Sequence, residues 1–198
     1  MKIFLYLLLT LVCGCIIGCT NSNEGYRING TTSQSRLNGK KVFLVPYGTR
    51  AYEDSIGVDS TIIKDGKFEF RGNKGEFLAR VTIDMKHRHG TQDLLIVTEP
   101  GDISVVIDSV SSATGTPQNE AMQSWKDLKE NRDRVHWNQS QHIKYLQEQG
   151  DTVYAKSLAD SLRNFNNHFI DQVHGLMRQL GPGTAYNLLL QRYGEPNQ

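Results

Sequence analysis

Three cysteines, Cys13, Cys15 and Cys19, lie close together near the amino terminus, and the sequence has no others. Clustered thiols are typical of a redox pair, of a metal site, or of a segment that is processed during export. Thiol exchange needs an attacking thiolate, and a structural zinc site needs about four ligands. The residues that surround the three cysteines indicate which of these three alternatives applies.

The residues before Cys19 are typical of a secretory signal. Lys2 is followed by an apolar run that ends in small residues, which is shorter than a spanning helix with charged flanks. The stretch from Ile16 to Cys19 (Ile-Ile-Gly-Cys) resembles the lipobox of bacterial lipoproteins. That resemblance implies acylation of the Cys19 thiol, cleavage before Cys19 and acylation of the new amino terminus. The alternative is an ordinary secreted protein whose signal ends in cysteine.

Cleavage before Cys19 would leave 180 of the 198 residues, with 21 basic and 21 acidic side chains. No block of like charge appears, so we expect no nucleic-acid partner. Cys19 would be the only cysteine of the mature chain, which excludes a disulfide within it. We expect the mature protein to depend on core packing for its stability.

The chain divides into four parts on pattern and composition. We expect a signal peptide over 1–18, a tether over 19–25, a β domain over 26–114 and a helical region over 115–198. The β domain has seven segments with period-two alternation, and no helix-length crossovers separate them, which predicts an antiparallel β-sandwich and an α+β protein overall. The predicted strands are 26–29, 41–47, 60–64, 67–71, 77–84, 93–99 and 102–108.

Two local features refine this β domain. Asp65-Gly66 lies between two predicted strands and predicts a tight hairpin, because both residues tolerate the positive φ of a primed turn. The segment 93–99 is apolar on both faces, which predicts a central strand.

The helical region begins with Thr116 as N-cap and Pro117 at the first helical position. We expect one helix to about Gln149 and a second helix from Asp151, joined by a turn at Gly150. Helices of about 30 residues would be roughly 45 Å long and would extend beyond the β domain. A break at 181–183 precedes a short final helix over 184–193.

Several segments of the chain resemble one family, the domain of unknown function 4369. They are "YRING" (26–30), "GKKVFLVPY" (39–47), "VDSTIIKDGKFEFRG" (58–72), "EPGDISVVID" (99–108) and "GTPQNEAM" (115–122). In lipoproteins of Gram-negative anaerobes this module lies between a lipobox and a thioredoxin-like domain with a Cys-x-x-Cys pair. Because the mature chain has no free thiol, we expect the redox activity of those relatives not to apply here.

Candidate chemical sites are few in the sequence. His87 and His89 have a spacing that some metal sites use, but no third ligand is indicated, so an exposed polar loop is the preferred interpretation and no metal or other cofactor is expected. Nucleophile-elbow, phosphate-loop and zinc-protease motifs are absent from the sequence. Among the aromatic residues, Trp125 is expected in the core. Trp137 lies off the apolar stripe and is a candidate partner-binding residue.

An aspartate followed by serine or threonine, in most cases with an aliphatic residue next, occurs five times. This pattern resembles the O-glycosylation sequon that some of these anaerobes use on exported proteins. The candidate residues are Ser55, Ser60, Ser109, Thr152 and Ser161.

These observations predict a lipoprotein of the cell envelope that a lipid on Cys19 anchors to a membrane. We expect the outer membrane, on its periplasmic or surface face, and a non-enzymatic module that binds another envelope protein. One alternative is an accessory component of a redox system, on which a separate thioredoxin-like protein docks. A third hypothesis is a hydrolase that uses the region of His87 and His89.

Overall fold

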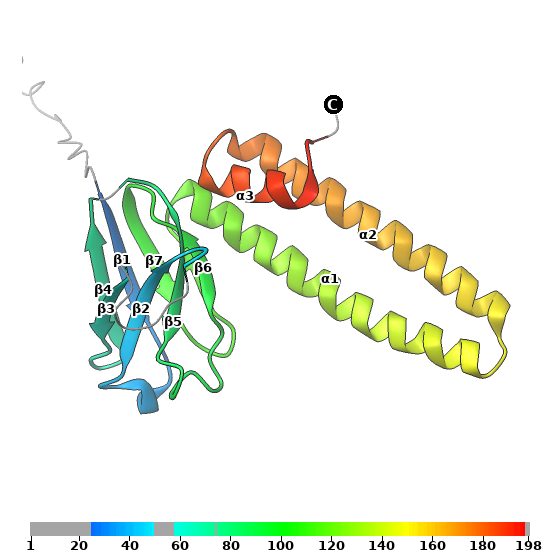
Figure 1. The fold of residues 1–198 in the computed structure, drawn as a ribbon, viewed down its shortest axis with the longest axis horizontal. Coiled ribbons are helices and arrows are strands. Elements are labelled where there is room, and N and C mark those ends of the chain that lie inside the picture. Colours follow the sequence, from blue (N-terminus) through cyan, green and yellow to red (C-terminus); the bar gives the residue numbers. More distant parts are fainter. Residues whose placement is uncertain (1–24, 50–57, 74, 197–198) are drawn as a thin grey trace, which may run out of the picture.

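The computed structural model describes residues 25–49, 58–73 and 75–196. In this part of the chain, eight strands form two four-stranded sheets, and three helices follow them (Figure 1). This arrangement confirms the predicted β-sandwich-like domain followed by a helical hairpin, an α+β fold overall. No helix among the described residues combines the length and the hydrophobicity that crossing a bilayer requires.

The elements follow the sequence pattern closely. The strands are β1 (Tyr26–Thr31), β2 (Lys41–Pro46), β3 (Asp59–Ile62), β4 (Lys67–Gly72), β5 (Leu78–Ile83), β6 (Leu94–Val97), β7 (Gly101–Val106) and β8 (Ser112–Thr114). A 3-10 turn, η1 (Ser35–Leu37), precedes β2, and the helices are α1 (Pro117–Glu148), α2 (Thr152–Leu180) and α3 (Thr184–Tyr193). The prediction of seven strands missed β8, which has only three residues and too little alternation to detect.

The sheets have the strand orders β4-β1-β7-β8 and β3-β2-β5-β6. Neighbouring strands are antiparallel except β1 and β7, which run parallel with Tyr26 opposite Gly101. The prediction of a fully antiparallel sandwich is corrected at this one pair. The exception places the start of β1 beside the start of β7, where the Gly101 N–H donates to the Gly25 carbonyl at 3.2 Å.

Two clusters of buried side chains hold the molecule together. The first lies between the sheets and contains the inward residues of both, such as Ile28, Val81 and Ile103. The second joins β6 to the three helices through Val97, Trp125 and other residues. The expectation that Trp125 belongs to the core is confirmed, since 5% of it is exposed.

The prediction that segment 93–99 forms a central strand is wrong, because β6 lies at the edge of its sheet. It is apolar on both faces for another reason. Leu94 and Ile96 face the sandwich core, while Leu95 and Val97 face the helical cluster. A strand covered by helices needs apolar residues on both faces wherever it lies in the sheet.

The helices begin and end where the sequence predicts. Pro117 occupies the first turn of α1, Gly150 has a φ of 82° at the turn between the long helices, and the Asp151 carboxylate accepts from the Tyr154 N–H at 3.1 Å. The hairpin of α1 and α2 leaves the sandwich at an angle and extends away from it, while α3 folds back onto the base of the hairpin (Figure 1). We refer to the part of this hairpin beyond Glu130 of α1 as the helical arm.

Candidate interaction site

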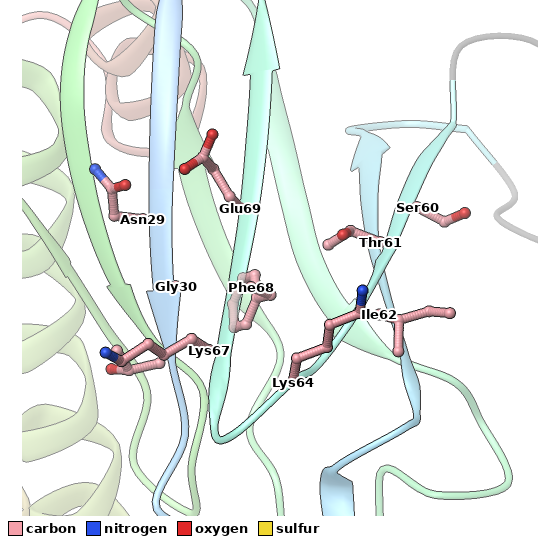
Figure 2. Close-up of a pocket in the computed structure, with 10 residues that line it drawn as sticks. Asn29, Gly30, Ser60, Thr61, Ile62, Lys64, Lys67, Phe68 and Glu69 are labelled. Carbon is pink, nitrogen blue, oxygen red and sulfur yellow. The ribbon is translucent and has the colours of Figure 1, made fainter.

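A groove opens between β3 and β4, at the sandwich edge that lies opposite the helices (Figure 1). Its volume is about 800 Å³, and Figure 2 shows its lining side chains. We call it the edge groove. Its lining residues are Asn29, Gly30, Thr31, Ser60, Thr61, Ile62, Lys64, Lys67, Phe68 and Glu69.

The hairpin between β3 and β4 explains why the groove is open. Asp65 and Gly66 have φ angles of 50° and 70°, so the predicted tight turn forms. Beside this turn, the two strands pair with each other only through the Lys64–Lys67 β-bridge, because β3 then pairs with β2 while β4 pairs with β1. The predicted hairpin is thus a corner between the two sheets, and its strands diverge from the turn.

Among the described residues, no strand pairs with the edge of β4 that faces the groove. Lys67 exchanges two backbone hydrogen bonds of 2.9 Å with Lys64, on the side away from β1. Successive residues of an antiparallel strand bond alternately to one side and the other. The backbone N–H and C=O groups of Glu69 and Arg71 therefore point to this same side, away from β1.

The edge of β3 faces the groove with fewer open groups. The Ile63 N–H bonds to the Lys40 carbonyl of the neighbouring chain segment at 3.0 Å, so the backbone groups of Ser60 and Ile62 point away from β2. The Asp59 carboxylate already accepts the Ser60 N–H at 2.7 Å. The edge of β4 is therefore the more open of the two.

The groove has apolar side chains inside and the Lys64 cation toward its narrow end, while the Lys67 side chain extends over β1 (Figure 2). Phe68 and Thr61 face each other across the gap, and the Lys64 side chain lies along it (Figure 2). Among the described residues, neither Lys64 nor Lys67 has an ion pair. The Ile62 side chain at the rim is 47% exposed.

Glu69, the one carboxylate among the described residues that line the groove, is already neutralised. Arg71 donates to Glu69, and Arg27 donates to its second oxygen at 3.1 Å. These hydrogen bonds, from Arg71 first and then Arg27, hold the pKa of the Glu69 carboxyl below its usual value. The free charge along the groove is therefore positive.

The opposite edge of the sandwich is closed by α1. The Asn119 side chain pairs with the backbone of Val97 in β6 like a neighbouring strand, with bonds of 3.0 Å to the N–H and 2.8 Å to the carbonyl. The Glu99 carboxylate accepts the backbone N–H groups of Gln118 and Asn119 at 2.7 and 3.1 Å. Because an anion is stabilised at a helix N-terminus, Glu99 fixes the start of α1 to the sandwich.

The N-terminus of α3 is held in a similar way. The Glu76 carboxylate accepts the Thr184 N–H at 2.8 Å, and the Gln118 side chain accepts the Ala185 N–H at 2.9 Å. Burial acts to raise the pKa of Glu76, but hydrogen bonds from Thr184 and Gln118 outweigh it and lower that pKa. The sandwich thus supplies an acceptor to two of the helices.

The helical arm leaves the sandwich after Glu130, which accepts a hydrogen bond from Gln92 at 2.6 Å. Beyond Glu130, the polar contacts of α1 among the described residues are within α1 or with α2, such as that from Arg132 to Asn166. The 18 residues from there to the end of α1 extend about 27 Å. Trp137 lies on this arm and is 66% exposed.

The tip of the arm carries further exposed apolar side chains. Tyr145, Val153 and Tyr154 are 57%, 82% and 51% exposed. The His142 ring meets the Tyr154 ring edge-on, with centroids 6.1 Å apart. Trp137 and these residues give the arm a discontinuous aromatic surface.

The other sequence candidates lie apart from one another. Cys19 and Ser55 fall outside the described residues. The remaining candidate glycosylation residues are exposed, and Ser60 lines the edge groove. These residues are Ser60, Ser109, Thr152 and Ser161.

The histidine loop forms hydrogen bonds with its neighbours. The His87 ring approaches Asp84 at 3.5 Å, and the backbone carbonyls of His87 and His89 accept from Arg36. Within the described ranges, no three histidine, cysteine or carboxylate side chains gather as metal ligands would.

Sequence reasoning missed the edge groove, because a tight turn between two strand-like segments is typical of an ordinary two-stranded hairpin. One signal was present in the sequence. Ile62, the last residue of β3, is followed directly by Ile63, so the two apolar side chains point to opposite faces, and the structure buries Ile63 while Ile62 remains half exposed.

Among the described residues, fold and site together define an α+β protein whose sandwich is closed at one edge by the start of α1 and open at the other. The model of the family described as Domain of unknown function (DUF4369) matches residues 26–122, and this part of the chain belongs to that family. The match confirms the resemblance seen in the sequence, and it includes the whole edge groove together with Gln118 and Asn119. No curated protein and no solved structure matches the chain.

Proposed function

We propose that the protein is a lipoprotein of the cell envelope that works as a non-enzymatic binding module. A lipid on Cys19 anchors it to the outer membrane, and the helical arm presents its exposed aromatic residues to another envelope protein. The observation that carries the proposal is the arm itself. It extends about 27 Å past the contact of Glu130 with the sandwich and exposes Trp137.

Exposed tryptophan is unusual on a helix that already has a buried apolar face. Trp and Tyr are enriched at the centres of protein interfaces, because they bury a large area at a small cost in side-chain entropy. α1 uses Trp125 and Met122 for its own packing, which leaves Trp137 without a role in the core. A partner that covers Trp137 would explain this arrangement.

The proposed anchor is tested by labelling cells with an alkyne fatty acid and separating membranes from soluble protein. The wild-type protein should carry the label and remain with the membranes. Cys19→Ala should lose both properties, whereas Cys15→Ala is the matched control and should keep them. An unlabelled wild-type protein, or a labelled Cys19→Ala variant, would refute the anchor.

The binding role of the arm is tested with a photo-crosslinking amino acid in cells. Placed at position 137, it should give a discrete adduct with one envelope protein. The same group at Met85, which is exposed on a loop of the sandwich outside the arm, serves as the control and should give little of it. Equal adducts at both positions, or none, would count against the arm, while a thioredoxin-like adduct would favour the accessory role in a redox system.

A further inference from the structure

The edge groove is a second surface feature, at the opposite side of the sandwich from the helices. Its walls are the edges of β3 and β4, which diverge from the turn at Asp65 and Gly66 and which no other described strand covers. At the other edge of the sandwich, the Asn119 side chain occupies the backbone groups of Val97. Within the part of the chain that the structure describes, α1 closes one edge of the sandwich with a side chain, and the other edge is open.

Open strand edges bind other strands, because each unpaired N–H and C=O group gains a partner. On β4 the backbone groups of Glu69 and Arg71 face the gap, two residues apart, as an added strand requires. On β3 the Ser60 N–H is already bonded to Asp59. An incoming strand therefore finds its better template on β4.

The side chains of the groove select what such a strand contains. Residues that point inward would meet Phe68 and Thr61, which face each other across the gap (Figure 2). Near the narrow end, Lys64 is an unpaired cation among the described residues, while Arg27 and Arg71 neutralise Glu69. Apolar side chains alternating with at least one acidic side chain complement these walls.

We propose that the edge groove binds an extended peptide segment of a partner protein, which adds as a strand to β4. Its inward apolar side chains pack beside the buried Phe68 ring and against Thr61, and an acidic side chain lies against Lys64. This strand would fill the space that the corner between β3 and β4 leaves between the two sheets.

The test uses the full-length protein in detergent and a displayed library of random twelve-residue peptides. Selected peptides should alternate apolar and polar residues and carry acidic ones. The critical comparison is between two substitutions of one residue. Glu69→Pro removes the N–H that faces the groove and should weaken binding about tenfold, whereas Glu69→Ala keeps that N–H and should bind at least as well as wild type.

The charge is tested separately. Lys64→Glu should weaken binding of the acidic peptides about tenfold, and Lys144→Glu on the arm should leave it unchanged. Amide hydrogen exchange on the wild-type protein gives a readout that needs no variant. Exchange at Glu69 and Arg71 should slow when the peptide binds, because their N–H groups acquire acceptors.

Several outcomes would overturn the proposal. They are a library that yields no enriched peptide, enriched peptides that are basic, equal binding by Glu69→Pro and wild type, or unchanged exchange at Glu69. If the wild-type protein forms dimers without peptide and the Glu69→Pro variant is monomeric, the edge of β4 pairs with a second copy of this chain instead. Since neither the label nor the crosslink enters these measurements, failure here leaves the proposed anchor and arm unaffected.

Discussion

The Asn119 side chain connects α1 to the sandwich, and removing it measures how much this attachment contributes to the stability of the protein. It is fully buried, and it bonds to the Val97 N–H at 3.0 Å, the Val97 carbonyl at 2.8 Å and the Thr116 hydroxyl at 2.8 Å. Asn119→Ala would leave both backbone groups of Val97 without these partners in a dry environment. Each unsatisfied group costs about 1–3 kcal/mol.

The free energy of unfolding should therefore fall by about 2–5 kcal/mol, a large part of the roughly 5–15 kcal/mol that domains of this kind possess. For a chain of this length the melting temperature should fall by about 5–15 °C. Urea unfolding followed by circular dichroism measures the change. It reports on the sandwich and the helices together.

Asn167→Ala is the matched control, since it makes the same chemical change at an exposed position of α2. It should change the stability by less than about 0.5 kcal/mol. A loss below about 1 kcal/mol for Asn119→Ala would refute the reasoning, because the groups of Val97 would then have found other partners.

Other contacts of the sandwich give further tests. Glu99→Gln should cost about 1 kcal/mol in urea unfolding, because the acceptor at the N-terminus of α1 loses its charge, and an unchanged midpoint would contradict this. Gly30→Ala should cost about 1–3 kcal/mol, since a Cβ there overlaps the Phe68 ring; a melting temperature equal to wild type would disprove the overlap. Burial acts to raise the pKa of Asp108, but hydrogen bonds from Ser33 outweigh it and lower that pKa. The stabilisation by Asp108 should thus be complete above its unfolded pKa of 3.8 and should decline as the pH falls below that value. In the Asp108→Asn variant, the melting temperature should therefore fall less steeply on the acid side than in wild type.

The sequence predicted local structure better than strand pairing. Alternation shows which side chains face a core, and this located seven of the strands, while Pro117 and Gly150 located the ends of the long helices. Pairing depends on contacts between distant segments, which alternation does not encode. This explains why the parallel neighbours β1 and β7 and the edge position of β6 were missed.

The candidate site shows the same division. Exposure of Trp137 followed from its place off the apolar stripe of α1, a property of one helix. The edge groove exists because β3 and β4 join different sheets after the Lys64–Lys67 bridge. Which sheet each strand joins depends on tertiary contacts. The Asp65-Gly66 turn is compatible both with an ordinary two-stranded hairpin and with a corner between two sheets.

The contact between Gly25 and Gly101 determines how mechanical force would travel through the molecule. Gly25 precedes β1, Gly101 begins β7, and a Cβ on Gly101 would lie 3.1 Å from the Thr116 side chain at the start of α1. Tension between Gly25 and the helical arm would therefore run through these three residues at one end of the sandwich. Lys64 and Lys67 lie at the other end of the sandwich, beside the last residue of β1, so the closed end of the edge groove is away from this connection.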